Sequence, residues 1–152
     1  MPSMGPNGHM QLALAEARAA AERGEVPVGA VIIGPDGAVL AAAGNRTREQ
    51  SDPTAHAEIL AIRSACRTLG QERLADCDLY VTLEPCPMCA AAISFARIRR
   101  LYFGASDPKS GGVENGPRIF SHATCHHAPE VYGGIAASEA SALLISFFAA
   151  RR

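Results

Sequence analysis

Apolar residues recur at helical spacing in four stretches of the chain. These stretches are residues 10–23, residues 52–70, residues 85–96 and a final stretch that begins at Ser138. Asp52 followed by Pro53 suits a helix start, since Asp is a good N-cap and Pro fits the first helical position. Ser138 is the expected cap of the last helix. Gly24 and Gly70 are typical helix stops. Together with the four apolar stretches, these end signals predict four helices.

Short runs of apolar and β-branched residues predict strands between these helices. The runs are residues 28–33, 39–44, 78–83 and 99–104, with a short one at 131–132. The sequence Gly34-Pro35-Asp36-Gly37 predicts a hairpin turn between the first two. Later strands are separated by helices, which predicts parallel crossovers. The expected fold is therefore α/β, in three α/β/α layers around a central mixed sheet.

The N-terminal segment is expected to differ from the rest of the chain in its degree of structural order. Residues 1–9 are rich in Gly and Pro and are predicted to be disordered, whereas residues 10–152 are predicted to form a single domain. Residues 105–117 form a long loop rich in Gly and Ser. A loop of this length inside a compact domain is often functional.

Composition excludes several classes of protein. The chain has 152 residues, 48% of them hydrophobic and 19% charged, which is not the composition of a disordered protein. The net charge of −1 gives no sign of a broadly basic nucleic-acid binder. No apolar run approaches the ~20 residues of a membrane span, and the start lacks the features of a signal peptide. We expect a reducing, cytoplasmic location, where the odd count of five cysteines argues against disulfides.

Two short motifs carry the candidate chemistry. His56-Ala57-Glu58 is expected at the start of the second helix, and Cys86-Pro87-Met88-Cys89 at the start of the third. One His and two Cys are the three protein ligands that a catalytic zinc uses while it keeps a fourth position open. The positive end of a helix also favours thiolate over thiol. One strand crossover would bring both helix starts to the same end of the sheet, where α/β proteins usually bind ligands.

Alternatives remain for each motif taken alone. The Cys-x-x-Cys pair also fits a redox dithiol or part of a structural zinc site. Cys125-His126-His127 are consecutive, so a second metal site there is not expected. Cys66 and Cys77 are expected to be structural thiols. The two motifs together form the signature of zinc deaminases.

The chain resembles the bacterial tRNA-specific adenosine deaminases of the cytidine deaminase-like superfamily. The resemblance runs from about residue 10 to residue 152. Its strongest stretches are residues 25–31 (EVPVGAV), 52–59 (DPTAHAEI) and 79–89 (LYVTLEPCPMC), followed by FGASDPK at 103–109 and LLISFFAARR at 143–152.

This resemblance implies roles for individual residues. His56, Cys86 and Cys89 would bind one Zn²⁺ per chain, with water in the fourth position. Glu58 would be the general acid/base that moves protons while adenosine becomes inosine. Asn45 would contact the bound nucleoside, although a turn residue of this type needs no such role. Glu84 would either orient a ligand or be an ordinary carboxylate at a strand end.

The resemblance also implies a tRNA anticodon stem-loop as the substrate and a homodimer as the assembly. Asp107 and Lys109 on the long loop, and Phe148 and Arg151 in the last helix, are the predicted RNA contacts. Of Phe147 and Phe148, one is expected in the core and the other exposed. The arginines at 97, 99 and 100 are a further candidate RNA surface. The small-residue run 90–92, with the apolar positions 93, 95 and 98, is the predicted dimer contact.

Two other functions remain open from the sequence. A free-base or nucleoside deaminase, acting on cytosine, guanine or a related compound, would share the zinc chemistry. A redox or structural-zinc module without catalysis would not need Glu58.

Overall fold

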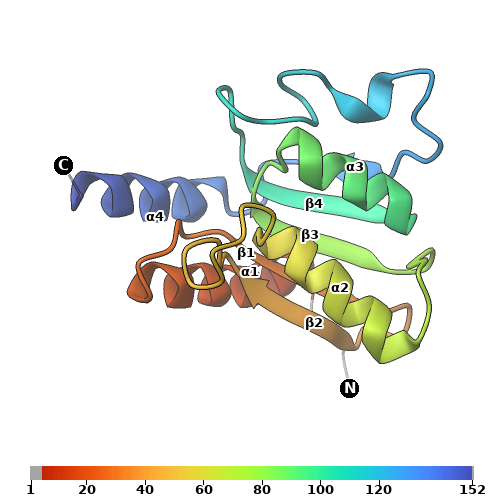
Figure 1. Cartoon of the computed structure of the whole chain (residues 1–152), viewed down its shortest axis with the longest axis horizontal. Coiled ribbons are helices and arrows are strands. Elements are labelled where there is room, and N and C mark those ends of the chain that lie inside the picture. Colours follow the sequence, from red (N-terminus) through yellow and green to blue (C-terminus); the bar gives the residue numbers. More distant parts are fainter. Residues whose placement is uncertain (1–4, 152) are drawn as a thin grey trace.

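A computed structural model describes residues 5–151 (Figure 1). Its elements are α1 (Pro6–Glu22), β1 (Gly29–Ile33), β2 (Val39–Gly44), α2 (Ala57–Leu69), β3 (Asp78–Leu83), α3 (Pro87–Ala96), β4 (Arg100–Ala105), the short 3₁₀ helix η1 (Ile119–Ser121), β5 (Glu130–Tyr132) and α4 (Ala137–Ala149). Among these residues, no helix combines the length and the apolar character needed to span a bilayer.

The strands form one mixed sheet in the order β2-β1-β3-β4-β5. β1 is antiparallel to both β2 and β3, and the turn between β1 and β2 is the predicted hairpin. β3, β4 and β5 are parallel, so α3 is the connection of a parallel crossover, as predicted. Leu83 lies opposite Ala105 in this register, which brings the carboxyl ends of β3 and β4 together.

Helices cover both faces of the sheet, and the three-layer α/β prediction is confirmed (Figure 1). One core, between the sheet and the pair α2 and α3, includes Ala61, Leu79 and Ile93. The other, between the sheet and the pair α1 and α4, includes Leu14 and Ala140.

The N-terminal prediction of disorder over residues 1–9 is wrong from residue 6 onward. Helix α1 begins at Pro6, four residues before the predicted start, with Pro in the first turn where its missing N–H costs nothing. The helix is held there because His9 is buried, with its ring 5.0 Å from the ring of Tyr80. Residues 1–4, and residue 152 at the other end, lie outside the described residues.

The start of the last helix also differs from its prediction. Ser138 does not cap α4, because the helix begins at Ala137 and the N-cap is Ala136 in a left-handed conformation with φ 57°. No side chain caps this end. Instead Glu139, in the first turn, accepts a hydrogen bond of 3.2 Å from Gln11 of α1. A tertiary contact between side chains thus links the start of α4 to α1.

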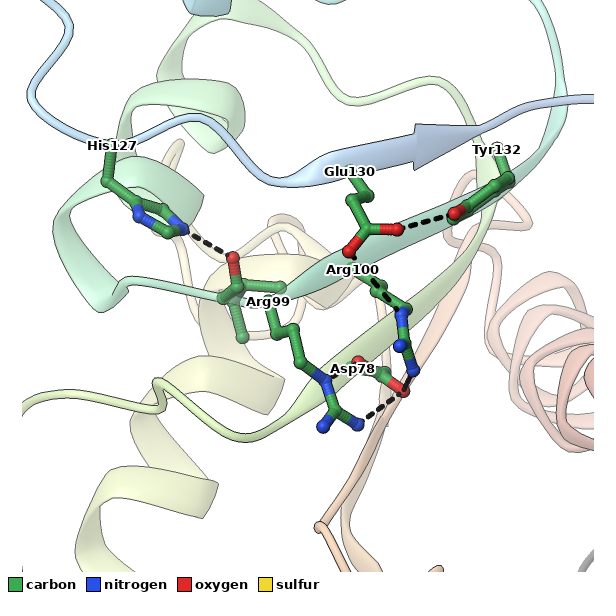
Figure 2. A network of polar contacts seen from close by, with 7 residues as sticks. Asp78, Arg99, Arg100, His127, Glu130 and Tyr132 are labelled. Carbon is green, nitrogen blue, oxygen red and sulfur yellow. Dashed lines mark hydrogen bonds and ion pairs between the residues drawn. The ribbon is translucent and has the colours of Figure 1, made fainter.

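A polar network ties together the amino ends of β3, β4 and β5 (Figure 2). Arg99 donates to Asp78 at 3.0 Å, and Arg100 lies 3.8 Å from Asp78 and 3.7 Å from Glu130. Tyr132 donates to Glu130 at 2.6 Å. Arg99 and Arg100 are thus neutralised by carboxylates, at the opposite end of β4 from its carboxyl end. This position does not support the predicted RNA surface at these two residues.

Candidate metal centre and reaction pocket

The two predicted motifs lie at neighbouring helix starts. His56 is the N-cap of α2, Cys86 is the N-cap of α3, and Cys89 lies in the first turn of α3. Both helices begin later than predicted. Asp52 does not cap α2, because its carboxylate accepts hydrogen bonds from the backbone N–H and the hydroxyl of Thr54 and closes a turn before the helix.

The three side chains converge into one triangle of donor atoms. The Nδ1 atom of His56 lies 3.7 Å from Sγ of Cys86 and 3.5 Å from Sγ of Cys89. Two ligands bound tetrahedrally at about 2.3 Å (sulfur) and about 2.0–2.1 Å (nitrogen) from zinc lie about 3.6 Å apart. The triangle therefore fits a zinc ion. Within residues 5–151 it is the one cluster of His, Cys, Asp and Glu that meets the spacing for a metal site.

The two cysteines of this triangle have opposite pKa shifts. A hydrogen bond from the Cys89 thiol, followed by one from His56, lowers the pKa of Cys86 to about 4. The same bond to Cys86, together with burial, raises the pKa of Cys89. One thiolate thus suppresses ionisation of the other, and a divalent cation is the partner that favours both. The donor set is that of a zinc site with one position left for a non-protein ligand.

Glu58 is the buried carboxyl group of the site. It lies at the second position of α2, two residues after His56, and is only 4% exposed. His56 has extended backbone angles as the N-cap, which lets both side chains line the same pocket, as predicted. Burial raises the pKa of Glu58 to about 7. A carboxyl group with this pKa both accepts and returns protons near neutral pH.

Asn45 has a structural role that explains its position. Its side-chain oxygen accepts a 2.8 Å hydrogen bond from the backbone N–H of Ala57, the first residue of α2. An amide from another segment thus satisfies one of the free N–H groups at the helix start. Because the oxygen is used, Asn45 is left with its NH₂ group as a hydrogen-bond donor for the pocket that it lines.

Glu84 anchors the loop that follows β4. Its buried carboxylate accepts three consecutive backbone N–H groups, those of Val113, Glu114 and Asn115, at 3.0–3.1 Å. It also accepts the backbone N–H of Asp107 at 3.0 Å. Burial opposes the charge, but these hydrogen bonds outweigh it, and the pKa of Glu84 is lowered.. These contacts show that Glu84 is more than an ordinary carboxylate at a strand end, and its bonds go to the loop and not to His56, Cys86 or Cys89.

The loop held by Glu84 approaches the metal-ligand segment closely. A Cβ atom at Gly112 would lie 2.6 Å from the backbone N of Pro87 and 2.8 Å from the carbonyl carbon of Cys86. The N–H of Gly112 donates to the carbonyl oxygen of Pro85 at 2.8 Å. The glycines of this loop therefore allow its backbone to pack directly on the turn that carries Cys86.

Substitution of Glu84 by Gln is expected to loosen this loop without displacing the metal ligands. The new NH₂ group would face backbone donors and leave them unpaired, at a cost of about 3 kcal/mol in the free energy of unfolding. Hydrogen exchange at Val113 and Asn115 and chemical unfolding measure the effect. Glu114→Gln, at an exposed side chain in the same loop, is the matched control; equal stability of the two variants would contradict the anchoring role.

Glu25 anchors the loop on the other side of the pocket. Its side chain is 2% exposed and accepts the backbone N–H groups of Arg48 at 3.1 Å and Glu49 at 2.9 Å. Sequence reasoning missed this role, because the contact joins residues more than twenty positions apart. A charged residue inside the otherwise apolar sequence around Val26 and Val28 was the available signal.

The pocket has a volume of about 230 Å³. It is lined by Val26, Val28, Asn45, Thr47, His56, Glu58, Leu83, Glu84, Cys86, Asp107 and Ser110. Of the predicted RNA contacts, Asp107 lines this pocket, whereas Lys109 is exposed on the same loop. Phe148 is 48% exposed and Phe147 is buried, as expected for this pair. Arg151 is exposed, with its guanidinium 3.6 Å above the ring of Phe147.

Known proteins share this fold and these motifs. Residues 6–105 match the model of the cytidine and deoxycytidylate deaminase zinc-binding region. The tRNA-specific adenosine deaminase of Agrobacterium fabrum is 66% identical over 143 residues, which are 94% of this chain and 93% of that protein. A structure from a study of A-to-I editing by tRNA:A34 deaminases has a TM-score of 0.88 and 67% identity, and covers 90% of this chain and 99% of its own. A guanine deaminase structure from Bacillus subtilis is 42% identical, with a TM-score of 0.66, over 68% of this chain and 66% of its own.

Proposed function

We propose, on the premise that this chain belongs to the tRNA-specific adenosine deaminases of the cytidine and deoxycytidylate deaminase zinc-binding family, that it converts adenosine to inosine at the wobble position of a tRNA anticodon. The observation that carries the proposal is the zinc-compatible triangle of His56, Cys86 and Cys89 beside the buried carboxyl group of Glu58, in one pocket. The reaction consumes water and releases ammonia.

The metal ligands and Glu58 have different roles in this hydrolysis. A zinc ion held by His56, Cys86 and Cys89 would lower the pKa of a water molecule in its fourth position from about 15.7 toward 7. As the C6–O bond forms, Glu58 would carry one proton of the attacking water to a ring nitrogen of adenine. It would then carry the second proton, from the new C6 hydroxyl group, to the amino group, which leaves as ammonia when the C6–N bond breaks. Its burial keeps bulk water away from these transfers, and its raised pKa suits a group that must work in both directions.

Asn45 and Asp107 line the pocket and are the proposed contacts to the nucleoside. The free NH₂ group of Asn45 donates a hydrogen bond, so it requires an acceptor on the base or ribose. The target base must turn outward to reach the floor of the pocket. A base in an anticodon loop is already partly unstacked, which lowers the cost of this step.

Phe148 is a proposed contact to the nucleotides that flank the target. Substitution of Phe148 by Ala should raise the KM for an anticodon stem-loop roughly tenfold, because stacking on an aromatic ring contributes about 1–3 kcal/mol per base. The kcat should change little. Ile145, which is 69% exposed on the same helix, gives the matched control Ile145→Ala. Equal KM values for the two variants would remove Phe148 from the RNA surface.

A homodimer is the proposed assembly, through the outer face of α3. Part of the predicted dimer contact cannot face a second chain, because Ala90, Ile93 and Ile98 are buried in the chain's own core. Phe95 is 77% exposed beside a hollow of about 420 Å³. This exposed aromatic side chain supports the proposal.

Substitution of Phe95 by Glu is expected to convert the dimer to a monomer at micromolar concentration, because it places a charge in the apolar contact. Light scattering measures the mass of each species. Val39→Glu, at a residue exposed to 48% on strand β2, is the control and should leave the dimer intact. A monomeric parent protein at this concentration would defeat the proposal.

A free-base deaminase is the second candidate, favoured by the 42% identity with a guanine deaminase. That similarity covers 68% of this chain, whereas the 66% identity with a tRNA-specific enzyme covers 94%. The tRNA substrate is therefore preferred. With tRNA as substrate, we also propose the cytoplasm as the place of the reaction.

A further inference from the structure

Three arginines from different parts of the chain meet at the turn after α1. The Nη1 atom of Arg48 donates to the carbonyl oxygen of Gly24 at 3.5 Å. Arg151, from the end of α4, lies over the same residue, since a Cβ atom at Gly24 would be 3.9 Å from its Nη2 atom. Arg23, the C-cap of α1, donates through Nη2 to the carbonyl oxygen of Asn45 at 3.1 Å.

Each of these guanidinium groups is oriented by a backbone carbonyl group and not by a carboxylate. Arg151 donates to the carbonyl oxygen of Phe147 at 3.3 Å, as Arg23 and Arg48 do to the carbonyl oxygens named above. Among residues 5–151, the ion pairs engage Arg18, Arg46, Arg99 and Arg100, and none involves Arg23, Arg48 or Arg151. Figure 2 shows the contrasting case, in which Arg99 and Arg100 are neutralised by Asp78 and Glu130.

The acidic residues near this cluster form hydrogen bonds or ion pairs with other partners, although the charge of Glu25 also acts on Arg23 and Arg48. The buried carboxylate of Glu25 accepts the backbone N–H groups of Arg48 and Glu49. Glu49 is paired with Arg46 at 2.7 Å.

The cluster lies beside the reaction pocket. Arg23 is bonded to the backbone of Asn45, and the side chain of Asn45 lines that pocket. Arg23, Gly24, Glu25, Arg48 and Glu49 line an open hollow of about 530 Å³. Residues 45–49 thus contribute to both hollows, because Asn45 and Thr47 line the reaction pocket and Arg48 and Glu49 line the neighbouring one.

We propose that Arg23, Arg48 and Arg151 form a phosphate-binding site that holds the RNA backbone next to the target adenosine. A guanidinium group has five N–H donors in a planar fork, of which each of these side chains uses one in the contacts above. The fork matches the oxygen atoms of a phosphodiester, and the site's excess of positive charge matches its anion. The inference rests on the proposed function, because it takes RNA as the substrate.

The test is steady-state deamination of an anticodon stem-loop with adenosine at the wobble position, by the zinc-loaded protein. Arg23→Gln and Arg48→Gln should each raise the KM roughly fivefold to tenfold, with kcat within about twofold of the parent protein. Binding of the same stem-loop, measured in a Glu58→Gln background, should show a salt dependence whose log–log slope is shallower by about 0.7 for each lost contact.

Arg67→Gln is the matched control. It removes the same charge from an exposed residue in the last turn of α2, at the far end of that helix from His56. An unchanged KM and salt slope in Arg23→Gln and Arg48→Gln would overturn the phosphate site, as would an equal change in Arg67→Gln. Failure of the proposed function is a different result, since the parent protein itself would then form no inosine in the stem-loop.

Discussion

Glu58→Gln is expected to lose nearly all inosine formation while it keeps its fold and its zinc. Gln has nearly the same shape as Glu but cannot take up and return protons. Removal of a positioned acid/base group typically lowers the reaction rate by a factor of about 10²–10⁴. The loss here should reach or exceed the upper end, because one carboxyl group relays both protons in the proposed mechanism.

The measurement combines turnover of the stem-loop with zinc content and thermal unfolding. Glu72→Gln, at an exposed residue after α2, is the control and should match the parent protein in all three. A Glu58→Gln variant with near-parental turnover would show that another group moves the protons. A variant without zinc would show that Glu58 acts on the metal site itself.

Cys86→Ala is expected to lose both zinc and activity. Cys86 supplies one of only three protein donors, so the two that remain should bind the ion too weakly to retain it. The protein should also lose stability, because a ligand present at a thousand times its Kd stabilises the folded state by about 4 kcal/mol. For a chain of this size, that free energy corresponds to a decrease in Tm of about 10 °C.

Metal analysis and thermal unfolding of the parent, with and without a chelator, test this expectation. Cys66→Ala removes a half-buried thiol that lies outside the metal cluster, and it should retain one zinc per chain. Full zinc occupancy in Cys86→Ala would contradict the assigned ligand set.

Local sequence signals predicted most of the fold. The five strands lie within one residue of their expected bounds, because apolar runs and the Gly34-Pro35-Asp36-Gly37 turn are local features. Helix starts were less predictable. Asp52 and Ser138 are good caps by residue type, but Asp52 closes a turn with Thr54, and the contact of Glu139 with Gln11 holds the start of α4.

The metal site was predictable for a different reason. His56, Glu58, Cys86 and Cys89 occur in two compact motifs, and one crossover is enough to bring the motifs together. The supporting residues were not predictable in this way. Glu25 and Glu84 act through backbone N–H groups of loops more than twenty residues away, and the arginine cluster joins three segments at Gly24. Such contacts leave no spacing pattern in the sequence.

The central claim is that a wobble adenosine in RNA is the substrate. The most direct test is a side-by-side turnover measurement with the zinc-loaded protein. One arm contains an anticodon stem-loop with adenosine at the wobble position, and the other contains guanine, cytosine and their nucleosides together with adenosine. We predict inosine at the wobble position of the stem-loop and little or no turnover of the small compounds. Efficient deamination of a free base, with no inosine in the stem-loop, would contradict the proposed function.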